Sequence, residues 1–364
     1  MTTLPNVSAF VHSPLPPFMQ IAGPIPIETQ EREYALSQTD RGRIVVAVSD
    51  IQDLSWTLPG ACWGIASTRG QPYWVGFVSE EERRFRSEKV RLPLLGPMEG
   101  LLDLIEVFSQ TTAEGTTSAE NAIRDVLAFA ETQIASIQTG NISLTHASDL
   151  KPTGDTVARF LGSVIGRIAA DYRIRTIKGT DGRVTFTVDV GNLTKPTSVI
   201  LDADVIRAGN YTRRRATSSI TVVGAGSQFE SRPATVVGST LAPNLGGVIQ
   251  SELVDKQEVD AIAQKFIGPA SVQRLTVFDE RSSKGIIAGA QARFTDRLRS
   301  VDQIALTLDL QSSLVQALRI GDVFRLTVEN WMNNIGVDTD VQVRSIRPRE
   351  EADVVDMITW VKQV

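Results

Sequence analysis

Three segments near the C-terminus alternate between apolar and polar residues, and this period restricts the last third of the chain to β-strands. They span residues 319–328, 340–346 and 355–361. A period of two places successive side chains on opposite faces of a strand, so each segment can bury one face and expose the other. The segments predict the closing strands of a small β-barrel, in which Gly321-Asp322 forms a structural turn.

An earlier group of segments repeats this pattern. Residues 43–49, 61–67, 72–78 and 89–95 are short runs rich in β-branched, aromatic and aliphatic residues. Turn residues such as Leu58-Pro-Gly60 separate them. Several short strands at this spacing predict a small barrel or sandwich in the first third of the chain.

Helical periodicity appears between the two β-rich regions. Apolar residues recur at helical spacing over 98–108, over 123–137 after a Thr117/Glu120 capping box, and over 157–168. A polar linker over 139–153 is expected to join the second and third of these helices. All three are amphipathic, so they require a surface on which to pack.

A hairpin and further strands follow the third helix. Residues 172–177 and 183–190 flank Gly179-Thr-Asp-Gly182, which carries the Asp-Gly signal of a hairpin turn. The second β-rich region is expected to begin at Thr197. Its other predicted elements are strands over 219–223, 274–278 and 303–310 and a helix over 255–266.

The first 30 residues contain closely spaced prolines, which oppose a helix and favour extended chain. These include Pro14, Pro16, Pro17, Pro24 and Pro26. The segment is expected to be either a disordered tail or an extended arm lying across a neighbouring subunit. Apolar residues between the prolines favour the arm, because disordered tails are seldom so apolar.

Together these patterns predict an α+β chain, mainly β, with two small β-barrels joined by a helical and hairpin insertion. The expected parts are an extended Pro-rich arm (1–30), a first β-barrel with a trailing helix (31–110), the helical and hairpin insertion (111–195), and a second β-barrel with an inserted helix (196–364). A chain of 364 residues is long enough for two or three domains.

The charge and cysteine content exclude several classes of protein. A formal net charge of −5 argues against a protein that coats nucleic acid, which needs an excess of clustered Lys and Arg. A single cysteine, Cys62, excludes an intramolecular disulfide framework and favours folding in a reducing cytoplasm. No segment is apolar enough to suggest a membrane span or a secretion signal, so a soluble protein is expected.

Residues able to carry catalysis are few. The two histidines are His12, in the Pro-rich segment, and His146, in the predicted polar linker. Neither position suits a Ser/His/Asp or Cys/His arrangement. Cys62 adjoins Trp63 in an apolar strand, where a small buried residue is the ordinary explanation. We therefore expect no enzymatic activity and assign no catalytic, cofactor-binding or metal-binding residue.

Four other patterns are interpreted as structural. The segment 222–228 ends a strand in Gly-x-Gly but lacks the third glycine and the helix of a dinucleotide-binding loop. The pairs Asp202/Asp204 and Asp338/Asp340 could hold a hard cation, although solvated turns or a nearby arginine explain them more simply. The basic run 211–215 and the acidic-then-basic run 80–86 are expected to be charged loops or intersubunit contacts.

The order of these parts resembles the tail hub proteins of tailed phages. The likeness is carried by segments 71–78 (Gln-Pro-Tyr-Trp-Val-Gly-Phe-Val), 90–102 (a strand leading into the first helix), 219–226 (the expected first strand of the second barrel), and 318–326 with 341–346 (its final strands). The resemblance implies two barrels like those of tail tube subunits, with three copies forming a pseudo-sixfold ring.

The resemblance implies a structural hub at the tail tip. The implied partners are two further copies of the chain, the tail tube or distal tail protein, the tape measure protein, and a tail tip or fibre protein, with DNA passing through without sequence recognition. The implied location is the tail tip of a virion assembled in the host cytoplasm.

Two other functions remain open. The first is a distal tail adaptor or receptor-binding baseplate protein that recognises a host-surface polymer through exposed aromatic residues, with Trp56, Trp63, Tyr73 and Trp74 as candidates. The second is a glycan or peptidoglycan hydrolase with paired carboxylates. No lysozyme or peptidase module is recognisable in the chain.

Overall fold

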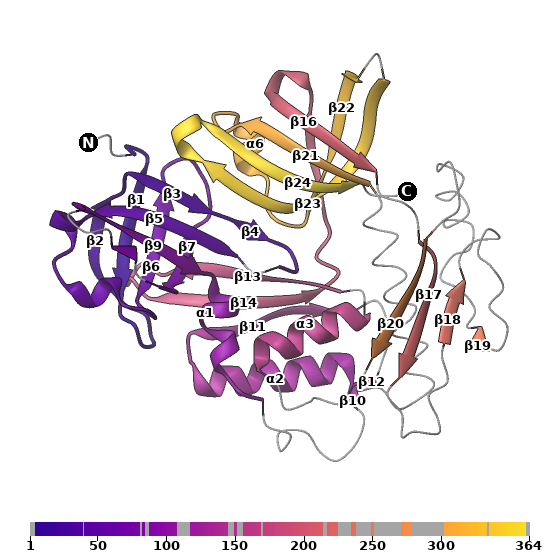
Figure 1. Cartoon of the computed structure of the whole chain (residues 1–364), viewed down its shortest axis with the longest axis horizontal. Coiled ribbons are helices and arrows are strands. Elements are labelled where there is room, and N and C mark those ends of the chain that lie inside the picture. Colours follow the sequence, from indigo (N-terminus) through magenta and orange to yellow (C-terminus); the bar gives the residue numbers. More distant parts are fainter. Residues whose placement is uncertain are drawn as a thin grey trace.

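The computed structural model shows three packed parts and a separate small sheet (Figure 1). It describes residues 4–38, 40–80, 82–83, 87–107, 117–144, 149–150, 156–168, 170–213, 217–224, 234–237, 249–250, 271–277, 302–332 and 335–361. Strands greatly outnumber helices in this part of the chain, so the predicted α+β, mainly β class is confirmed.

The N-terminal part is an antiparallel sheet, here called the first sheet, with strand order β2-β1-β6-β7-β9-β5-β3 and with β8 paired to β9. Its strands are β1 (Val7–His12), β2 (Gln20–Pro26), β3 (Thr29–Arg32), β5 (Arg41–Ala47), β6 (Cys62–Ser67), β7 (Trp74–Val78), β8 (Glu82–Arg83) and β9 (Lys89–Leu95). Alternate residues of these strands, such as Ile44 and Val46 in β5, converge on one buried core. The four strands predicted over 43–95 are confirmed as β5, β6, β7 and β9.

The expectation that residues 1–30 form a tail or an arm outside the first barrel is wrong. The segment supplies β1 and β2, and β1 lies between β2 and β6 in register from Val7↔Ser67 to His12↔Cys62. Its apolar residues alternate, so Val7 and Val11 enter the core of the first sheet. The prolines are accommodated because those at 14–17 lie between the strands and those in β2 lie at the sheet edge, where a missing N–H is tolerated.

The middle part packs three helices and a three-stranded sheet against the first sheet. Its elements are α1 (Pro97–Gly100), α2 (Ala119–Gln133), β11 (Ile137–Ser143), α3 (Val157–Ile168), β13 (Asp171–Lys178) and β14 (Val184–Gly191). The strand order is β11-β14-β13, with β11 parallel and β13 antiparallel to β14. Apolar residues of α1, α2, α3 and the three strands form one core with Phe18 and Phe77.

The predicted hairpin is confirmed as β13 and β14, and three other details differ from expectation. Within the described residues, the helix expected over 98–108 is only α1 and a 3-10 turn at Leu102–Leu104. Between them Leu101 leaves the helical conformation, with φ −134° and ψ −57°. The expected linker over 139–153 begins as β11, whose Ile142 is buried. Ser118, not Thr117, caps α2 by accepting a hydrogen bond from the Asn121 amide.

The C-terminal part is a second sheet with order β15-β22-β23-β24-β21-β16. Its strands are β15 (Lys195–Leu201), β16 (Ile206–Arg213), β21 (Asp302–Asp309), β22 (Asp322–Met332), β23 (Ile335–Arg349) and β24 (Val354–Val361), and α6 (Ser313–Ala317) joins β21 to β22. The three predicted closing strands are confirmed as β22, β23 and β24. Gly321 takes a positive φ of 87°, and the Asp322 side chain accepts from the Arg319 amide at 2.8 Å, as a structural turn requires.

The prediction that segments 219–223 and 274–278 belong to the second barrel is wrong. They form β17 (Thr217–Gly224) and β20 (Ser271–Val277) of a separate sheet with β18 (Ala234–Val237) and β19 (Ile249–Gln250), in the order β19-β18-β17-β20. Local alternation predicts a strand but does not identify its partner. The strands predicted from Thr197 and over 303–310 do lie in the second sheet, as β15 and β21, together with β16, which was not predicted. The helix predicted over 255–266 lies outside the described residues. None of the described helices is both long and apolar enough to cross a membrane.

Candidate functional site

The three parts meet at one junction, where the first sheet, the β13–β14 hairpin and the second sheet contact one another. The short strand β4 (Tyr34–Ala35), which lies between β3 and β5 of the first sheet in the chain, pairs with β23 of the second sheet at Ala35↔Ser345 and Tyr34↔Ile346. The next amide, Leu36 N–H, donates to the Arg344 carbonyl at 2.8 Å. Backbone hydrogen bonds therefore join elements that are about 310 residues apart in sequence.

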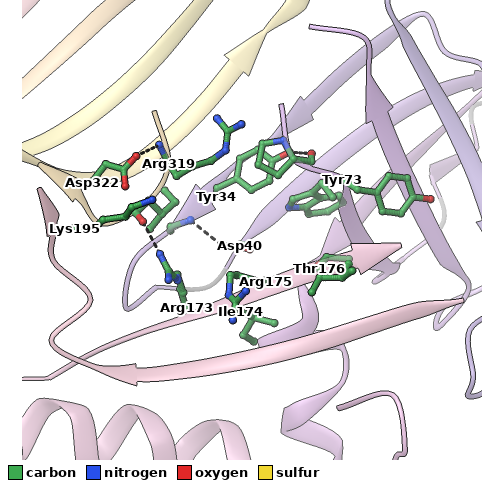
Figure 2. A pocket seen from close by; sticks show the side chains of 15 residues that line it. Tyr34, Asp40, Tyr73, Arg173, Ile174, Arg175, Thr176, Lys195, Arg319 and Asp322 are labelled. Carbon is green, nitrogen blue, oxygen red and sulfur yellow. Dashed lines mark hydrogen bonds between the residues drawn. The ribbon is translucent and has the colours of Figure 1, made fainter. Parts of the chain in front are cut away.

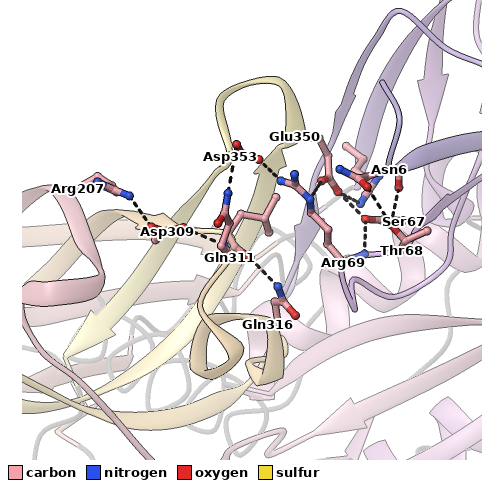
Figure 3. Close-up of polar contacts among 12 residues, drawn as sticks. Asn6, Ser67, Thr68, Arg69, Arg207, Asp309, Gln311, Gln316, Glu350 and Asp353 are labelled. Carbon is pink, nitrogen blue, oxygen red and sulfur yellow. Dashed lines mark hydrogen bonds and ion pairs between the residues drawn. The ribbon is translucent and has the colours of Figure 1, made fainter. Parts of the chain in front are cut away.

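A buried ionic network reinforces this junction (Figure 3). Arg32 of β3 donates to Glu350 at 3.1 Å, and both side chains are almost fully buried. Ser67 of β6 donates to the same Glu350 oxygen at 2.7 Å, while Arg69 pairs with Glu350 and Asp353. A buried charge is tolerated only when it is paired and hydrogen-bonded, so this network fixes the first sheet against the end of β23.

A second buried pair joins the hairpin to the second sheet. Arg344 of β23 donates from two nitrogens to Asp171 at the start of β13, at 2.9 and 2.8 Å. Ser37 also donates to Asp171, at 2.8 Å, and the Arg344 guanidinium stacks on the Trp360 ring at 3.8 Å from its centroid. Two-point pairing of this kind constrains orientation as well as distance.

The junction encloses a pocket of about 380 Å³, here called the junction pocket, which is lined by all three parts (Figure 2). Residues 34, 35, 40 and 72–74 form the wall beside the first sheet, residues 173–177 of β13 form another, and Lys195, Arg319, Ile320 and Asp322 form the third. Four of the lining side chains are cations. Asp189 accepts from two of them, Arg173 and Arg175, at 2.9 and 2.7 Å, and its pKa lies below the usual range: its burial favours the neutral form, but these hydrogen bonds outweigh that effect.

The two carboxyl groups that line the junction pocket have raised pKa values. Burial raises the pKa of Asp40 to about 8, against the opposing hydrogen bond from the Ala35 amide, so this carboxyl is mostly protonated at neutral pH. Burial also raises the pKa of Asp322, although Lys195, Arg319 and Arg173 favour its charged form. The cations of the pocket therefore outnumber its anions.

Neither candidate for nucleophilic or base chemistry has a catalytic environment. His12 is buried between the Tyr73 hydroxyl, at 2.7 Å from Nε2, and the Phe18 carbonyl, at 3.0 Å from Nδ1. Burial and, to a smaller extent, the nearby Lys178 charge lower its pKa to about 4, against the opposing hydrogen bond to the Phe18 carbonyl. Cys62 is fully buried in β6, as predicted, and burial raises the pKa of its thiol. His146 lies outside the described residues.

The other flagged residues divide between structural contacts and positions outside the described chain. Asp338 and Asp340 both pair with Arg325, at 2.7 and 3.2 Å, which confirms the arginine interpretation of that pair. Asp202 instead accepts from the Asp204 amide in a short 3-10 turn. Within the runs 80–86, 211–215 and 222–228, residues 81, 84–86, 214–215 and 225–228 lie outside the described part.

The residues that join the parts were missed by sequence reasoning. Arg32, Asp171, Arg344 and Glu350 are single charged residues in otherwise ordinary segments. The available signal is weak: a charge inside a predicted strand, as at Arg344 within the segment 340–346. It marks a candidate for a buried ion pair but does not name its partner.

Comparison of the sequence finds no matching family model and no matching curated protein. Comparison of the structure finds similar solved structures. A 43 kDa tail protein of prophage MuSo2 from Shewanella oneidensis shares 11% identity, with a TM-score of 0.61 and 98% of each chain covered. A tail protein from Neisseria meningitidis shares 12% identity, with a TM-score of 0.56 and coverage of 98% of this chain and 97% of that chain.

A third similar structure, the prophage tail protein gp18 from Listeria monocytogenes, shares 8% identity, with a TM-score of 0.52 and coverage of 91% of this chain and 87% of its own. These alignments extend over nearly the whole length of each chain. The likeness therefore includes the arrangement of the parts as well as the individual sheets. The resemblance predicted from the order of sequence segments is confirmed at the level of the fold: this chain has the fold of phage tail proteins.

Proposed function

We propose that this chain is a structural component of a phage tail, namely a hub protein of which three copies form a ring at the tail tip. The observation that carries the proposal is the joining of two sheets into one unit by the β4–β23 pairing and the buried Arg32–Glu350 and Asp171–Arg344 pairs. Three such chains would place six sheets around one axis. Whole-length likeness in fold to phage tail proteins supports this role.

The outer strands of both sheets provide surfaces for ring contacts. Strands β2 and β3 end the described first sheet, and β15 and β16 end the second. An outer strand carries backbone groups that a neighbouring subunit can pair with or cover. Exposed apolar side chains at such edges, Ile21 in β2 and Ile200 in β15, favour burial against another chain.

The proposed ring would join the tail tube or distal tail protein to the tip and would contact the tape measure protein and a tip or fibre protein. DNA would pass through it without sequence recognition, because a net charge of −5 repels phosphates. This role requires no catalytic residue, so we propose a protein without enzymatic activity. Its proposed location is the virion tail tip after assembly in the host cytoplasm.

The alternative is an adaptor that binds a surface polymer through exposed aromatic residues. Two of its four candidate residues are buried. Trp63 is fully buried and Trp74 is 2% exposed, so neither can stack on a sugar. The Tyr73 hydroxyl is hydrogen-bonded to His12, and Trp56 is partly buried against the core of the first sheet. The structure therefore favours the hub over polymer recognition by this aromatic set.

Native mass spectrometry of the purified protein, combined with negative-stain imaging, tests the hub proposal. The expected result is a particle of three times the chain mass of 39.6 kDa with a central hole. A hexamer would instead indicate an adaptor ring. A monomer at all accessible concentrations that binds host polysaccharide would refute the hub.

A further inference from the structure

In the described part of the chain, one edge of β13 pairs with no other strand, and this edge opens into the junction pocket. Within the described chain, β13 pairs only with β14, and Tyr172 exchanges hydrogen bonds on its other side with Ser37: its carbonyl accepts at 2.9 Å and its amide donates at 3.2 Å. Alternate residues of an antiparallel strand direct their backbone groups to the same side. Ile174 and Thr176 therefore direct their N–H and C=O groups away from β14, as Tyr172 does.

In the described part of the chain, these outward N–H and C=O groups of Ile174 and Thr176 have no hydrogen-bond partner. The five consecutive residues 173–177 line the junction pocket, as expected when a strand presents its edge (Figure 2). Outward groups on every second residue repeat at about 6.8 Å, which is the repeat of an extended strand. Ser37 already covers the first position of this edge, so an added segment would continue from that point.

The two faces of such a segment would meet different surroundings. On one face lie Arg173 and Arg175, which share Asp189, together with Lys195 and Arg319 across the pocket. Since the carboxylates here are fewer than the cations, this face keeps a net positive charge. The other face lies on the side of Ile174 and Tyr73, whose side chains pack against the core of the middle part. An occupant with acidic residues at every second position and apolar residues between them complements both faces.

We propose that the junction pocket binds an extended acidic segment of a partner protein, which adds to the free edge of β13 as a fourth strand of the sheet β11-β14-β13. Backbone hydrogen bonds to Ile174 and Thr176 supply the pairing, and Lys195 and Arg319 select for acidic side chains. This site is independent of the edges that would form a ring. It stands or fails separately from the proposed hub.

Binding of a defined peptide to the full-length protein tests the proposal. The probe is an acetylated and amidated hexapeptide of alternating Glu and Val with a fluorescent label, measured by anisotropy. The same peptide with Lys in place of Glu is the charge control, and one N-methylated at every second residue is the backbone control. The acidic peptide is expected to bind at least about tenfold more tightly than either control. Equal binding of all three peptides, or no binding of the acidic one, would overturn the proposal.

Two variants locate the binding at β13. Thr176→Pro removes an outward N–H without removing a hydrogen bond to β14, and it is expected to weaken binding about tenfold. Lys195→Glu, at an exposed position, is expected to weaken it about fivefold or more, whereas the charge-matched Arg124→Glu on α2 leaves it unchanged. Near-UV circular dichroism checks folding of each variant. If Thr176→Pro does not fold, Lys195→Glu decides: unchanged affinity in that variant refutes the site.

Discussion

At the scale of single residues, burial shifts the pKa values of His12, beside Tyr73, and Asp40, beside Tyr34, in opposite directions. Burial lowers the pKa of His12 to about 4 and raises the pKa of Asp40 to about 8, so both are mainly neutral at pH 7. His12 therefore favours folding above its unfolded pKa of 6.5, and this contribution is lost as the pH falls toward 4. Asp40 has the opposite sign, because its contribution is complete below its unfolded pKa of 3.8 and is lost as the pH rises through 8.

Substitution by uncharged residues should separate the two effects. Between pH 7.5 and pH 5 the stabilisation that His12 provides relative to His12→Gln is expected to shrink by about 2 kcal/mol. Over the same interval the stabilisation that Asp40 provides relative to Asp40→Asn is expected to grow. Urea unfolding of the wild type and both variants at several pH values measures these differences. Parallel pH profiles for the wild type and His12→Gln would contradict the buried neutral imidazole.

At the scale of elements, buried ion pairs join strands that are distant in sequence. Arg32 in β3 and Glu350 after β23 belong to different sheets, and their side chains are 0% and 2% exposed. Removing one partner of a buried pair leaves the other charge desolvated, which is more destabilising than the loss of an exposed pair. The exposed pair Arg41–Glu99, with side chains 70% and 33% exposed, provides a matched comparison.

Glu350→Gln is expected to lower the free energy of unfolding by about 3 kcal/mol, because Arg32 then keeps its charge without a carboxylate. Glu99→Gln, the same chemical change at the exposed pair, is expected to lower it by less than about 1 kcal/mol. Chemical denaturation followed by tryptophan fluorescence measures both. Equal effects of the two substitutions would show that the buried pair does not hold the sheets together.

At the scale of the whole molecule, the N-terminal segment is an internal part of the fold. β1 lies between two other strands, and Phe18 from the β1–β2 loop packs between Phe77 of the first sheet and Phe186 of the hairpin, with ring centroids 5.7 and 5.6 Å apart. One segment thus supports both the first and the middle part. This position explains why its prolines occur with so many apolar residues.

Deletion of residues 1–26 is therefore expected to prevent folding of the first sheet, and not only to weaken contacts between subunits. Loss of the near-UV circular dichroism signal and of soluble expression would be the measured outcome. Leu15→Ala, at a 72% exposed position of the same segment, is the control and is expected to preserve both. A truncated protein with the wild-type spectrum would restore the interpretation of the segment as a separate arm.

The sequence predicted the local elements of the fold more fully than the candidate site. Strands β5, β6, β7, β9, β22, β23 and β24 and the β13–β14 hairpin were predicted because their alternation and turn residues are local signals. The assignment of β17 to the second barrel was wrong because any sheet edge satisfies the same alternation. The junction pocket was not predicted, since its walls come from four separate stretches of the chain: residues 34, 35 and 40, residues 72–74, residues 173–177, and residues 195, 319, 320 and 322.

The closing strands over 319–361 separate what the sequence determines from what only the tertiary structure decides. Their sequence by itself determined that they are strands, which face of each is buried, and that Gly321-Asp322 is a turn, because side-chain period and backbone freedom act over a few residues. Only the tertiary structure decided that β23 extends past its pairing with β22 and there pairs with β4, and that Arg344 and Glu350 bind Asp171 and Arg32. A buried charge requires a partner, but the partner is chosen by how distant segments pack, which no local pattern records.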